Sequence, residues 1–424
     1  MIRMTESVLP QSPFAYSGGH LQCESVDIAD IARRTGTPVY VYSADSIRRQ
    51  FRAYDRAFGS HPHQVCYAVK ANSSLAVLNL LAKEGSGFDI VSGGELYRVL
   101  QAGGDPSTVV FSGVGKTAAE VEYALSQGIH SFNCESESEL ALIDALAGRL
   151  GAVASISLRV NPDVNAQTHP YISTGLREHK FGIDIERASS IYRLASQFNN
   201  LRATGVSCHI GSQLLDSTPL VEAVGKVLSL IEELRRAGFS IDHVDFGGGL
   251  GVAYRPSDEP PDVDRYIRTL VEMCKSHNLK VMVEPGRSIV GQAGALIMRV
   301  LYRKATESKE FIVVDAAMND LIRPSLYQSH HEIVPVRQSE LGTITADVVG
   351  PVCESGDFLA RGREIANVAP GDLLAICTAG AYGFVLASNY NSRTRSAEVL
   401  VEGDSWRVVR NRESLEDLVR GETI

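Results

Sequence analysis

The sequence predicts an α/β fold, namely a (β/α)8 TIM-like barrel followed by a C-terminal antiparallel β domain. Two observations lead to this prediction. Before Arg287 short apolar runs alternate with helical patterns, whereas after it short β-like runs follow one another. Strand–helix alternation indicates parallel strands, because each crossover helix returns the chain to the same edge of the sheet. The length of 424 residues is sufficient for two such domains.

Eight short apolar runs are expected to be the barrel strands. Helical patterns lie between them, the clearest of which runs from Thr218 to Gly238. Eight strand–helix units are what a (β/α)8 barrel requires, although the pattern alone leaves an open, doubly wound sheet as the alternative. The expected strands are Gln64–Val69, Phe88–Val91, Val109–Ser112, Ser131–Cys134, Ser155–Val160, Gly205–Cys208, His243–Phe246 and Lys280–Val283.

The remainder of the chain reads as a β domain with an N-terminal addition. Runs such as ALIMRVLYRK, LLAICTAGAYG and AEVLVEG are separated by polar turns. An early β-rich run, Val39–Tyr42, is expected to join them, and the residues before it look like an arm. We therefore expect an arm and strand over residues 1–43, a barrel over 44–288 and a β domain over 289–424.

Composition narrows the functional class. A net charge of −9 disfavours a nucleic-acid or anionic-membrane surface. Seven cysteines without a CxxC pair disfavour a disulfide framework or a zinc site and favour reduced thiols. The sequence has neither the apolar run of a signal peptide nor one long enough to span a membrane. We expect a cytoplasmic protein with a small-molecule substrate and no metal.

Candidate reactive residues follow the predicted barrel strands, whose carboxyl ends converge on one face. Lys70 follows the first strand in CYAVKAN, where poor solvation would lower its pKa and allow Schiff-base formation. Asp89 and Glu95 flank the second strand, and we expect Glu95 to cap the following helix. His209 follows the sixth strand in HIGSQ, with Ser212 close behind. Taken singly, a strand-end lysine is often a surface charge and a lone histidine is often structural.

Two glycine-containing loops follow the seventh and eighth strands. Gly249 lies in DFGGGLG, where backbone N–H groups can point at a phosphate. A plain tight turn and a Rossmann pyrophosphate loop are the alternatives, but residues 247–251 do not match GxGxxG in register. The segment Glu284–Arg287 (EPGR) offers a carboxylate for a ring nitrogen and an Arg for a phosphate or a substrate carboxylate.

The β domain contributes three further clusters. Arg323 and Tyr327 lie in RPSLY, Cys353 and Glu354 in GPVCESGD, and Tyr382 in GAYG. Each of them alone would be read as a core or turn residue. A free Cys most often packs as a small buried hydrophobe, so this reading of Cys353 stands beside a catalytic one.

Taken together, AVKAN, HIGSQ, GGGLG, EPGR and CESGD resemble the fold-type III pyridoxal-phosphate-dependent decarboxylases. Within that group, RVNPDVNAQTHPYISTGLREHKFGI, DAAMNDLIRPSLY and GAYGFVLASNYNSR are similar to diaminopimelate decarboxylases, and the resemblance covers nearly the whole chain. It implies pyridoxal 5'-phosphate as cofactor and decarboxylation of meso-2,6-diaminopimelate to L-lysine and CO2, the last step of lysine biosynthesis. It also implies a homodimer with shared active sites.

The same resemblance implies a role for each candidate. Lys70 would hold the cofactor covalently and His209 would stack on its ring. Cys353 would donate a proton and Glu354 would bind the substrate amine, both from across the dimer interface. The other implied cofactor contacts are Ser212, Gly249, Glu284, Pro285, Gly286, Arg287 and Tyr382, with Glu284 facing the ring nitrogen. The other implied substrate contacts are Arg287, Arg323, Tyr327 and Tyr382.

Elementary chemistry agrees with these roles. Loss of CO2 leaves a carbanion, for which a protonated pyridine ring is an electron sink. A nearby carboxylate favours that protonated ring, and a thiol can quench the carbanion. The second amino-acid end of diaminopimelate suits an Arg fork and a Glu carboxylate.

Three other readings remain at this point. A sister enzyme acting on ornithine, arginine or lysine has no distal carboxylate to bind and should not need Arg323 with Tyr327. An alanine racemase should offer a Tyr acid in place of Cys353 and Glu354. A non-catalytic regulator would be free to lose Lys70 or Cys353, and both are present.

Overall fold

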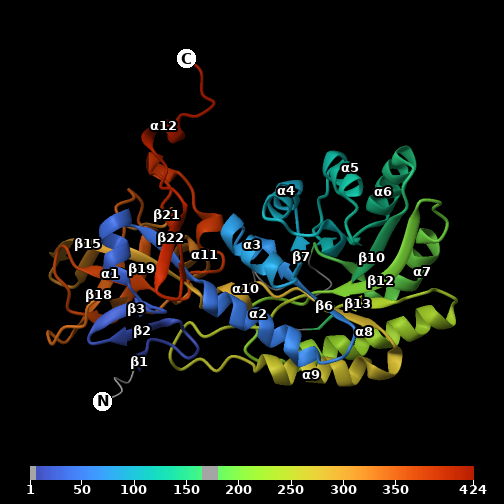
Figure 1. The fold of residues 1–424 in the computed structure, drawn as a ribbon, viewed down its shortest axis with the longest axis horizontal. Coiled ribbons are helices and arrows are strands. Elements are labelled where there is room, and N and C mark those ends of the chain that lie inside the picture. Colours follow the sequence, from blue (N-terminus) through green and yellow to red (C-terminus); the bar gives the residue numbers. More distant parts are fainter. Residues whose placement is uncertain (1–5, 165–179) are drawn as a thin grey trace. The chain divides into compact units, whose positions relative to one another are not determined.

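The computed structural model describes residues 6–164 and 180–424 (Figure 1). They form two compact units, which we describe separately. The barrel unit contains residues 48–252 and 260–288, and the β unit contains residues up to 47, 253–259 and 289–424. Residues 165–179, which carry part of the RVNPDVNAQTHPYISTGLREHKFGI segment, lie outside the described residues.

Within the described part of the barrel unit, eight parallel strands close on themselves. Each strand pairs with the next in chain order, β9 pairs with β10, and β14 pairs with β6 through Val281 and His63. This closure confirms the predicted barrel and excludes an open, doubly wound sheet. The strands are β6 (His63–Ala68), β7 (Gly87–Ile90), β8 (Val109–Phe111), β9 (Ser131–Cys134), β10 (Ala154–Asn161), β12 (Leu201–Cys208), β13 (His243–Asp245) and β14 (Lys280–Val283), and the short β11 (Ile183–Asp184) extends the sheet beside β10.

Helices surround these strands, and their sequences explain where they begin and end (Figure 1). Thr117 and Glu120 form a capping box at the start of α5, and Gly128 ends that helix in the left-handed conformation. In α8, residues such as Val224, Val227 and Ile231 recur at helical spacing and are buried. The helices are α2 (Ala44–Phe58), α3 (Leu75–Lys83), α4 (Gly93–Gln101), α5 (Ala118–Gln127), α6 (Glu137–Leu150), α7 (Ile185–Ala195), α8 (Thr218–Arg236), α9 (Val263–Cys274) and α10 (Arg287–Val290).

The main sheet of the β unit is mixed, whereas the sequence predicted an antiparallel one. Most neighbouring strands are antiparallel, but β16 pairs with β18 and β5 pairs with β21 in parallel. Parallel pairing requires a long connection, and both pairs join strands separated by other elements. The strands are β5 (Val39–Ser43), β15 (Gly294–Ala305), β16 (Glu310–Val314), β17 (Ile333–Pro335), β18 (Thr343–Val349), β19 (Phe358–Ala366), β20 (Leu373–Ile376), β21 (Ala397–Glu402) and β22 (Ser405–Arg410), with helices α11 (Arg323–Tyr327) and α12 (Leu415–Leu418).

The N-terminal residues form a small antiparallel sheet and a helix, and so are more ordered than the arm that the sequence suggested. Phe14, Leu21 and Ile28 are fully buried and share one apolar cluster with residues of β5 and β15. Burial of apolar side chains of this size is worth about 1.5–3 kcal/mol each, which explains why the segment folds onto the β unit. Its elements are β1 (Glu6–Ser7), β2 (Phe14–Ser17), β3 (His20–Cys23), β4 (Val26–Asp27) and α1 (Ile28–Thr35).

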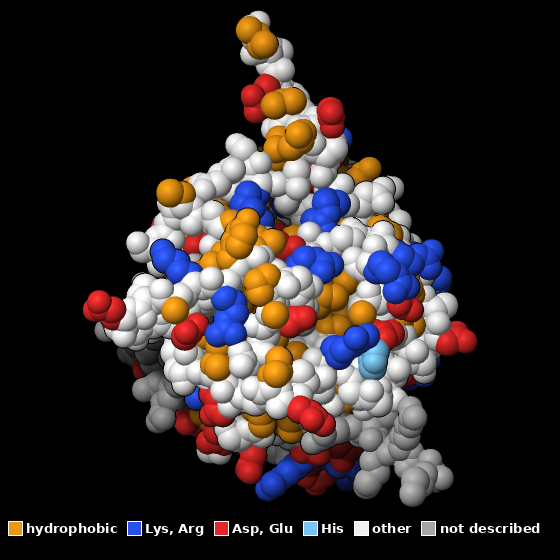
Figure 2. Space-filling view, turned by 90° about the vertical axis from the view of Figure 1, so that its left-hand side faces the viewer, with side chains coloured by type: hydrophobic (Ala, Val, Ile, Leu, Met, Phe, Trp, Pro, Cys, Tyr) orange, Lys and Arg blue, Asp and Glu red, His pale blue; other side chains and the backbone are white. Residues whose placement is uncertain are grey.

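The surface carries charges of both signs. On the face shown in Figure 2, Lys and Arg side chains lie among acidic and apolar ones and form no continuous basic field. Among the residues described, no helix is long and apolar enough to cross a membrane. The same residues contain no cluster of three or more His, Cys, Asp or Glu side chains that could hold a metal ion.

Candidate active site

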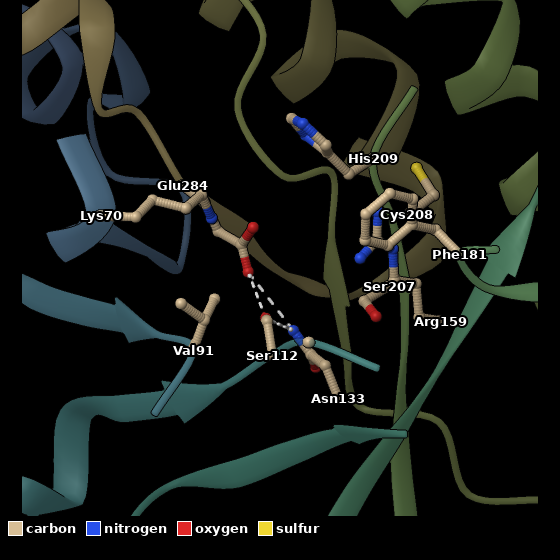
Figure 3. Close-up of a pocket in the computed structure, with 11 residues that line it drawn as sticks. Lys70, Val91, Ser112, Asn133, Arg159, Phe181, Ser207, Cys208, His209 and Glu284 are labelled. Atoms are coloured by element: carbon tan, nitrogen blue, oxygen red, sulfur yellow. Dashed lines mark hydrogen bonds between the residues drawn. The ribbon is translucent and has the colours of Figure 1, made fainter. Parts of the chain in front are cut away.

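A cavity of ≈ 180 Å³ lies in the barrel unit, lined mainly by residues that end or follow the barrel strands (Figure 3). This is the face on which (β/α)8 barrels build their active sites. Three of the sequence-predicted residues, Lys70, His209 and Glu284, line it. The other lining residues are Val91, Ser112, Gly113, Asn133, Arg159, Phe181, Ser207 and Cys208.

The amine of Lys70 is held by an ion pair. Lys70 lies in the turn Val69–Ala71 that follows β6, and its Nζ is 2.5 Å from Oδ2 of Asp89 on β7. The strand register explains the contact, because Ala68 pairs directly with Asp89. The Lys70 side chain is 36% exposed and Asp89 is fully buried. The amine is therefore charge-paired and partly solvated, instead of poorly solvated as the sequence argument assumed.

Glu95 lies in the first turn of α4, where the sequence predicted a helix cap, but the capping side chain is that of Ser92. Its N–H bonds to Ser92 Oγ at 3.2 Å, and its Oε2 accepts the Val91 N–H at 2.7 Å. Burial raises the pKa of the Glu95 carboxyl to about 7, against the lowering effect of that backbone bond and of Lys70. The residue anchors the loop between β7 and α4, which carries Val91 into the cavity wall.

His209 presents an uncharged ring. Burial, and then the positive charges of Arg159 and Lys70, hold its pKa well below the usual value. Its Nδ1 accepts the Gly248 N–H at 3.3 Å, which places the proton of the neutral ring on Nε2. A neutral imidazole in the cavity wall offers a flat face on which an aromatic ring can stack.

Glu284 and Asp245 form a buried carboxyl pair. Glu284 follows β14 and accepts hydrogen bonds from Asn133 at 3.3 Å and Ser112 at 3.4 Å (Figure 3). Burial, and then the negative charges of Asp245 and Asp89, raise the pKa of the Glu284 carboxyl well above its usual value. Burial likewise raises the pKa of the Asp245 carboxyl, at the end of β13, against the lowering effect of the hydrogen bond that its Oδ1 accepts from the Gly247 N–H at 2.9 Å.

Three loops approach one another so closely that only glycine fits. A Cβ on Gly248 would lie 2.4 Å from the carbonyl oxygen of Glu284. A Cβ on Gly249, whose φ is +125°, would lie 2.9 Å from the carbonyl oxygen of Gly211. The adjacent Ser212 hydroxyl accepts a hydrogen bond from Arg287 Nη2 at 3.0 Å. Close backbone, a hydroxyl and a guanidinium are the groups that bind a phosphate.

In the β unit, Arg323 and Tyr327 lie together on α11. The guanidinium of Arg323 lies 5.8 Å from the Tyr327 ring centre and 5.1 Å from that of Tyr254. Its Nε donates to His331 Nε2 at 3.3 Å and its Nη2 to Ser329 Oγ at 3.3 Å. Arg323 is buried, so its orientation is fixed by packing as well as by hydrogen bonds.

Cys353 and Glu354 lie in the turn between β18 and β19. Cys353 is exposed, whereas the other six cysteines are buried, so the reading of Cys353 as a packed hydrophobe is wrong. Its N–H donates to Asn391 Oδ1 at 3.0 Å, and Glu354 Oε2 accepts the Tyr390 hydroxyl at 2.8 Å. Tyr382 has a φ of +56°, an uncommon conformation for a bulky residue and one that clusters at functional sites.

Comparison with known proteins identifies the family. The family model for the pyridoxal-dependent decarboxylase, pyridoxal binding domain, matches residues 44–291. Diaminopimelate decarboxylase of Pseudomonas aeruginosa is 53% identical over 411 residues, which cover 97% of this chain and 99% of that protein. The chain belongs to the diaminopimelate decarboxylase family.

Solved structures agree with this membership of the diaminopimelate decarboxylase family. The enzyme from Helicobacter pylori, complexed with L-lysine, shares 44% identity over 93% of this chain and 98% of that chain, with a TM-score of 0.90. The enzyme from M. jannaschii, in co-complex with L-lysine, shares 36% identity over 98% and 99% of the two chains, with a TM-score of 0.94.

The sites predicted for this decarboxylase fall into two groups. In the barrel unit, Lys70, His209 and Glu284 share one cavity, and the remaining predicted barrel residues lie in the loops that follow β12, β13 and β14. In the β unit, Arg323 contacts Tyr327, and Cys353 adjoins Glu354. The residues in these loops are Ser212, Gly249, Pro285 and Gly286, Arg287 begins α10, and Tyr382 belongs to the β unit.

Sequence reasoning missed three polar residues of this decarboxylase site. Ser112 and Asn133 donate hydrogen bonds to Glu284, and the negative charge of Asp245 raises the pKa of Glu284. Ser112 directly follows β8, Asn133 is the last residue but one of β9, and Asp245 ends β13. That position was the available signal, since the same rule had selected Lys70 and His209.

The barrel residues fit pyridoxal phosphate. A primary amine, a neutral aromatic side chain, a buried carboxyl and a glycine-lined anion cradle correspond to its aldehyde, ring face, ring nitrogen and phosphate. The surroundings of Glu284 give a direct indication, because burial beside Asp245 and Asp89 raises its pKa and so disfavours its ionised form in the protein alone. A protonated ring nitrogen is a partner of the required charge and size.

Proposed function

We propose that this chain is a pyridoxal-phosphate-dependent carboxy-lyase that converts meso-2,6-diaminopimelate to L-lysine and CO2, the last step of lysine biosynthesis. The proposal rests on 53% identity to a diaminopimelate decarboxylase over nearly the full length of both chains, together with a barrel cavity that fits the cofactor. The cofactor is pyridoxal 5'-phosphate, whose conjugated ring takes up the electron pair that departing CO2 leaves behind.

The barrel residues hold and tune the cofactor. Lys70 is the point of covalent attachment, and Asp89 aligns its amine. His209 would stack on the ring, and Glu284 would pair with the ring nitrogen and favour its protonated form. The residues that would hold the phosphate are Ser212, Gly249, Pro285, Gly286 and Arg287, and Arg287 would also bind the substrate carboxylate.

The β unit recognises the end of the substrate that does not react. Arg323 and Tyr327 bind the distal carboxylate, and the aromatic packing around Arg323 preorganises its fork. Glu354 binds the distal ammonium, and Tyr382 contacts cofactor and substrate. Ornithine, arginine and lysine lack the distal carboxylate, so a buried Arg at this position disfavours them.

Cys353 protonates the carbon that has lost CO2. Its S–H proton forms the new C–H bond, and the thiolate regains a proton from solvent. The barrel of residues 44–288 binds the cofactor, and the β domain of residues 289–424, joined by residues 1–43, contributes Cys353 and Glu354. We propose that these two residues reach the site of a second copy, so that the enzyme is a homodimer with shared active sites.

Removal of the Lys70 amine tests the proposed function. Lys70→Ala should abolish both lysine formation from meso-diaminopimelate and the visible absorbance of bound cofactor. Lys83→Ala, an exposed lysine in the last turn of α3, is the matched control and should change neither. A Lys70→Ala enzyme with normal absorbance and turnover would refute the assignment.

Subunit mixing tests the shared site. Lys70→Ala and Cys353→Ala subunits are each expected to be inactive, yet a mixed dimer has one intact site. After exchange in equal amounts, about a quarter of wild-type activity should return if assembly is random and two-fold symmetric. Activity that never recovers, despite subunit exchange demonstrated by mass spectrometry, contradicts sharing.

A further inference from the structure

Two neighbouring residues of the β unit contact the two neighbouring residues of the proposed catalytic turn. Tyr390 donates its hydroxyl hydrogen to Glu354 Oε2 at 2.8 Å. Asn391 accepts the Cys353 backbone N–H on its Oδ1 at 3.0 Å. The partners in these two contacts are 36 and 38 positions apart in the sequence. Tyr390 and Asn391 therefore form one contact surface for Cys353 and Glu354.

The backbone conformation explains how two successive side chains reach the same turn. In extended chain, successive side chains point to opposite sides. Asn391 and Ser392 have φ values of +56° and +52°, both in the left-handed region. This conformation interrupts the alternation, and Asn tolerates it better than most residues.

The backbone of the catalytic turn is anchored separately. The carboxylate of Asp357 accepts the Val352 N–H at 2.7 Å and the Met318 N–H at 2.7 Å. These bonds fix where the turn lies, but they do not fix the exposed Glu354 side chain. Gly356 leaves room for that side chain, since a Cβ there would lie 3.0 Å from Glu354 Oε1. Tyr390 supplies the hydrogen bond that orders the carboxylate.

We propose that Tyr390 and Asn391 are positioning residues, of which Tyr390 aims the Glu354 carboxylate at the substrate ammonium and Asn391 sets the turn that presents Cys353. This inference rests on the proposed roles of Cys353 and Glu354. Tyr390 bonds to Oε2, and a carboxylate held by one oxygen keeps lone pairs with which to accept a hydrogen bond from the ammonium. The hydrogen bond to Glu354 raises the pKa of the Tyr390 hydroxyl, so the hydroxyl remains a donor throughout the working pH range.

The first experiment compares Tyr390→Phe with wild-type holoenzyme on meso-diaminopimelate. The variant keeps the ring and loses only the hydroxyl. We expect KM to rise about tenfold, as for a lost hydrogen bond to a charged group, while kcat changes by no more than about twofold. Tyr302→Phe, which changes an exposed tyrosine on β15, is the matched control and should leave both constants unchanged.

The second experiment concerns Asn391 and Cys353. Asn391→Gly removes the acceptor and accommodates the left-handed backbone, whereas Asn391→Asp keeps an acceptor oxygen. We expect Asn391→Gly to lower kcat about tenfold and to reduce the stereospecificity of deuterium uptake in heavy water. Asn391→Asp should keep both kcat and the stereospecificity of deuterium uptake close to the wild-type values. Equal defects in the two variants, or wild-type behaviour of Asn391→Gly, would overturn the role of Asn391.

A double-mutant cycle separates this inference from the proposed function. If Tyr390 acts through Glu354, Tyr390→Phe should have no further effect on KM in a Glu354→Gln background. Additive effects would overturn the positioning role in favour of a general structural one. An impaired Glu354→Gln enzyme with a wild-type Tyr390→Phe enzyme would overturn the inference and leave the proposed function standing. A wild-type Glu354→Gln enzyme would instead refute the assigned role of Glu354.

Discussion

The contact between Gly248 and the loop that follows β14 allows a quantitative prediction. A Cβ at Gly248 would lie 2.4 Å from the carbonyl oxygen of Glu284, whereas ordinary contact begins at 3.4 Å. The obstacle is backbone, which cannot rotate away, so Gly248→Ala must displace the Glu284 loop or the glycine loop by about 1 Å. A displacement of that size at a reacting centre costs about 10²-fold in rate. Gly248→Ala should therefore weaken cofactor binding and lower kcat/KM about 10²-fold.

The assay pairs cofactor affinity with folding stability. Cofactor affinity is measured by absorbance titration of the apoenzyme, and thermal unfolding is followed by circular dichroism. Gly225→Ala in α8 is the control, because a Cβ there has no heavy atom within 4 Å and alanine favours helix. It should leave cofactor affinity unchanged and stabilise the protein by about 0.5–1 kcal/mol. Wild-type cofactor affinity and turnover in Gly248→Ala would refute the reasoning about close backbone approach.

Three further predictions concern buried charges. Asp245→Asn removes a negative charge that raises the pKa of Glu284. The pH below which cofactor affinity falls, measured by titration at a series of pH values, should therefore become lower. An unchanged pH dependence would contradict the coupling of the two carboxyls. Burial, followed by the charge of Lys280, lowers the pKa of His130 to about 4, below the unfolded value of about 6.5, so its contribution to stability is present above pH 6.5 and lost as the pH falls toward 4. His130→Gln should flatten the dependence of urea-unfolding free energy on pH over that window, and an unchanged slope would count against it. Arg323→Ala should lower kcat/KM for meso-diaminopimelate about 10–100-fold with unchanged cofactor affinity, and loss of cofactor binding instead would make Arg323 structural.

The sequence predicted the barrel because each barrel strand has a local hydrophobic pattern of its own. Short apolar runs alternate with amphipathic helices, and the carboxyl end of each run marks the active face, which is how Lys70, His209 and Glu284 were found. Pairing between distant segments has no such local signal. The parallel pairing of β5 with β21 depends on how the chain folds back, so the mixed character of the second sheet could not be predicted.

The chemical environment of the candidates was also beyond sequence reasoning. The ion pair of Lys70 depends on the register that places Ala68 opposite Asp89. The raised pKa of Glu284 depends on burial and on the charge of Asp245, which ends a different strand, β13. The exposure of Cys353 and its contact with Asn391 depend on a turn that is held by two distant segments, at Met318 and Asn391. Residue type and position predicted the candidate list, whereas charge states and hydrogen-bond partners required the tertiary structure.

The most direct test of the proposed activity is a measurement of CO2 release and lysine formation by the purified holoenzyme with four substrates: meso-diaminopimelate, ornithine, arginine and lysine. A site built to bind a distal carboxylate rejects analogues that lack it, so kcat/KM for meso-diaminopimelate should exceed that for each of the others by about 10⁴-fold. One equivalent of L-lysine should form for each CO2 released. Comparable or faster decarboxylation of ornithine, arginine or lysine would contradict the account.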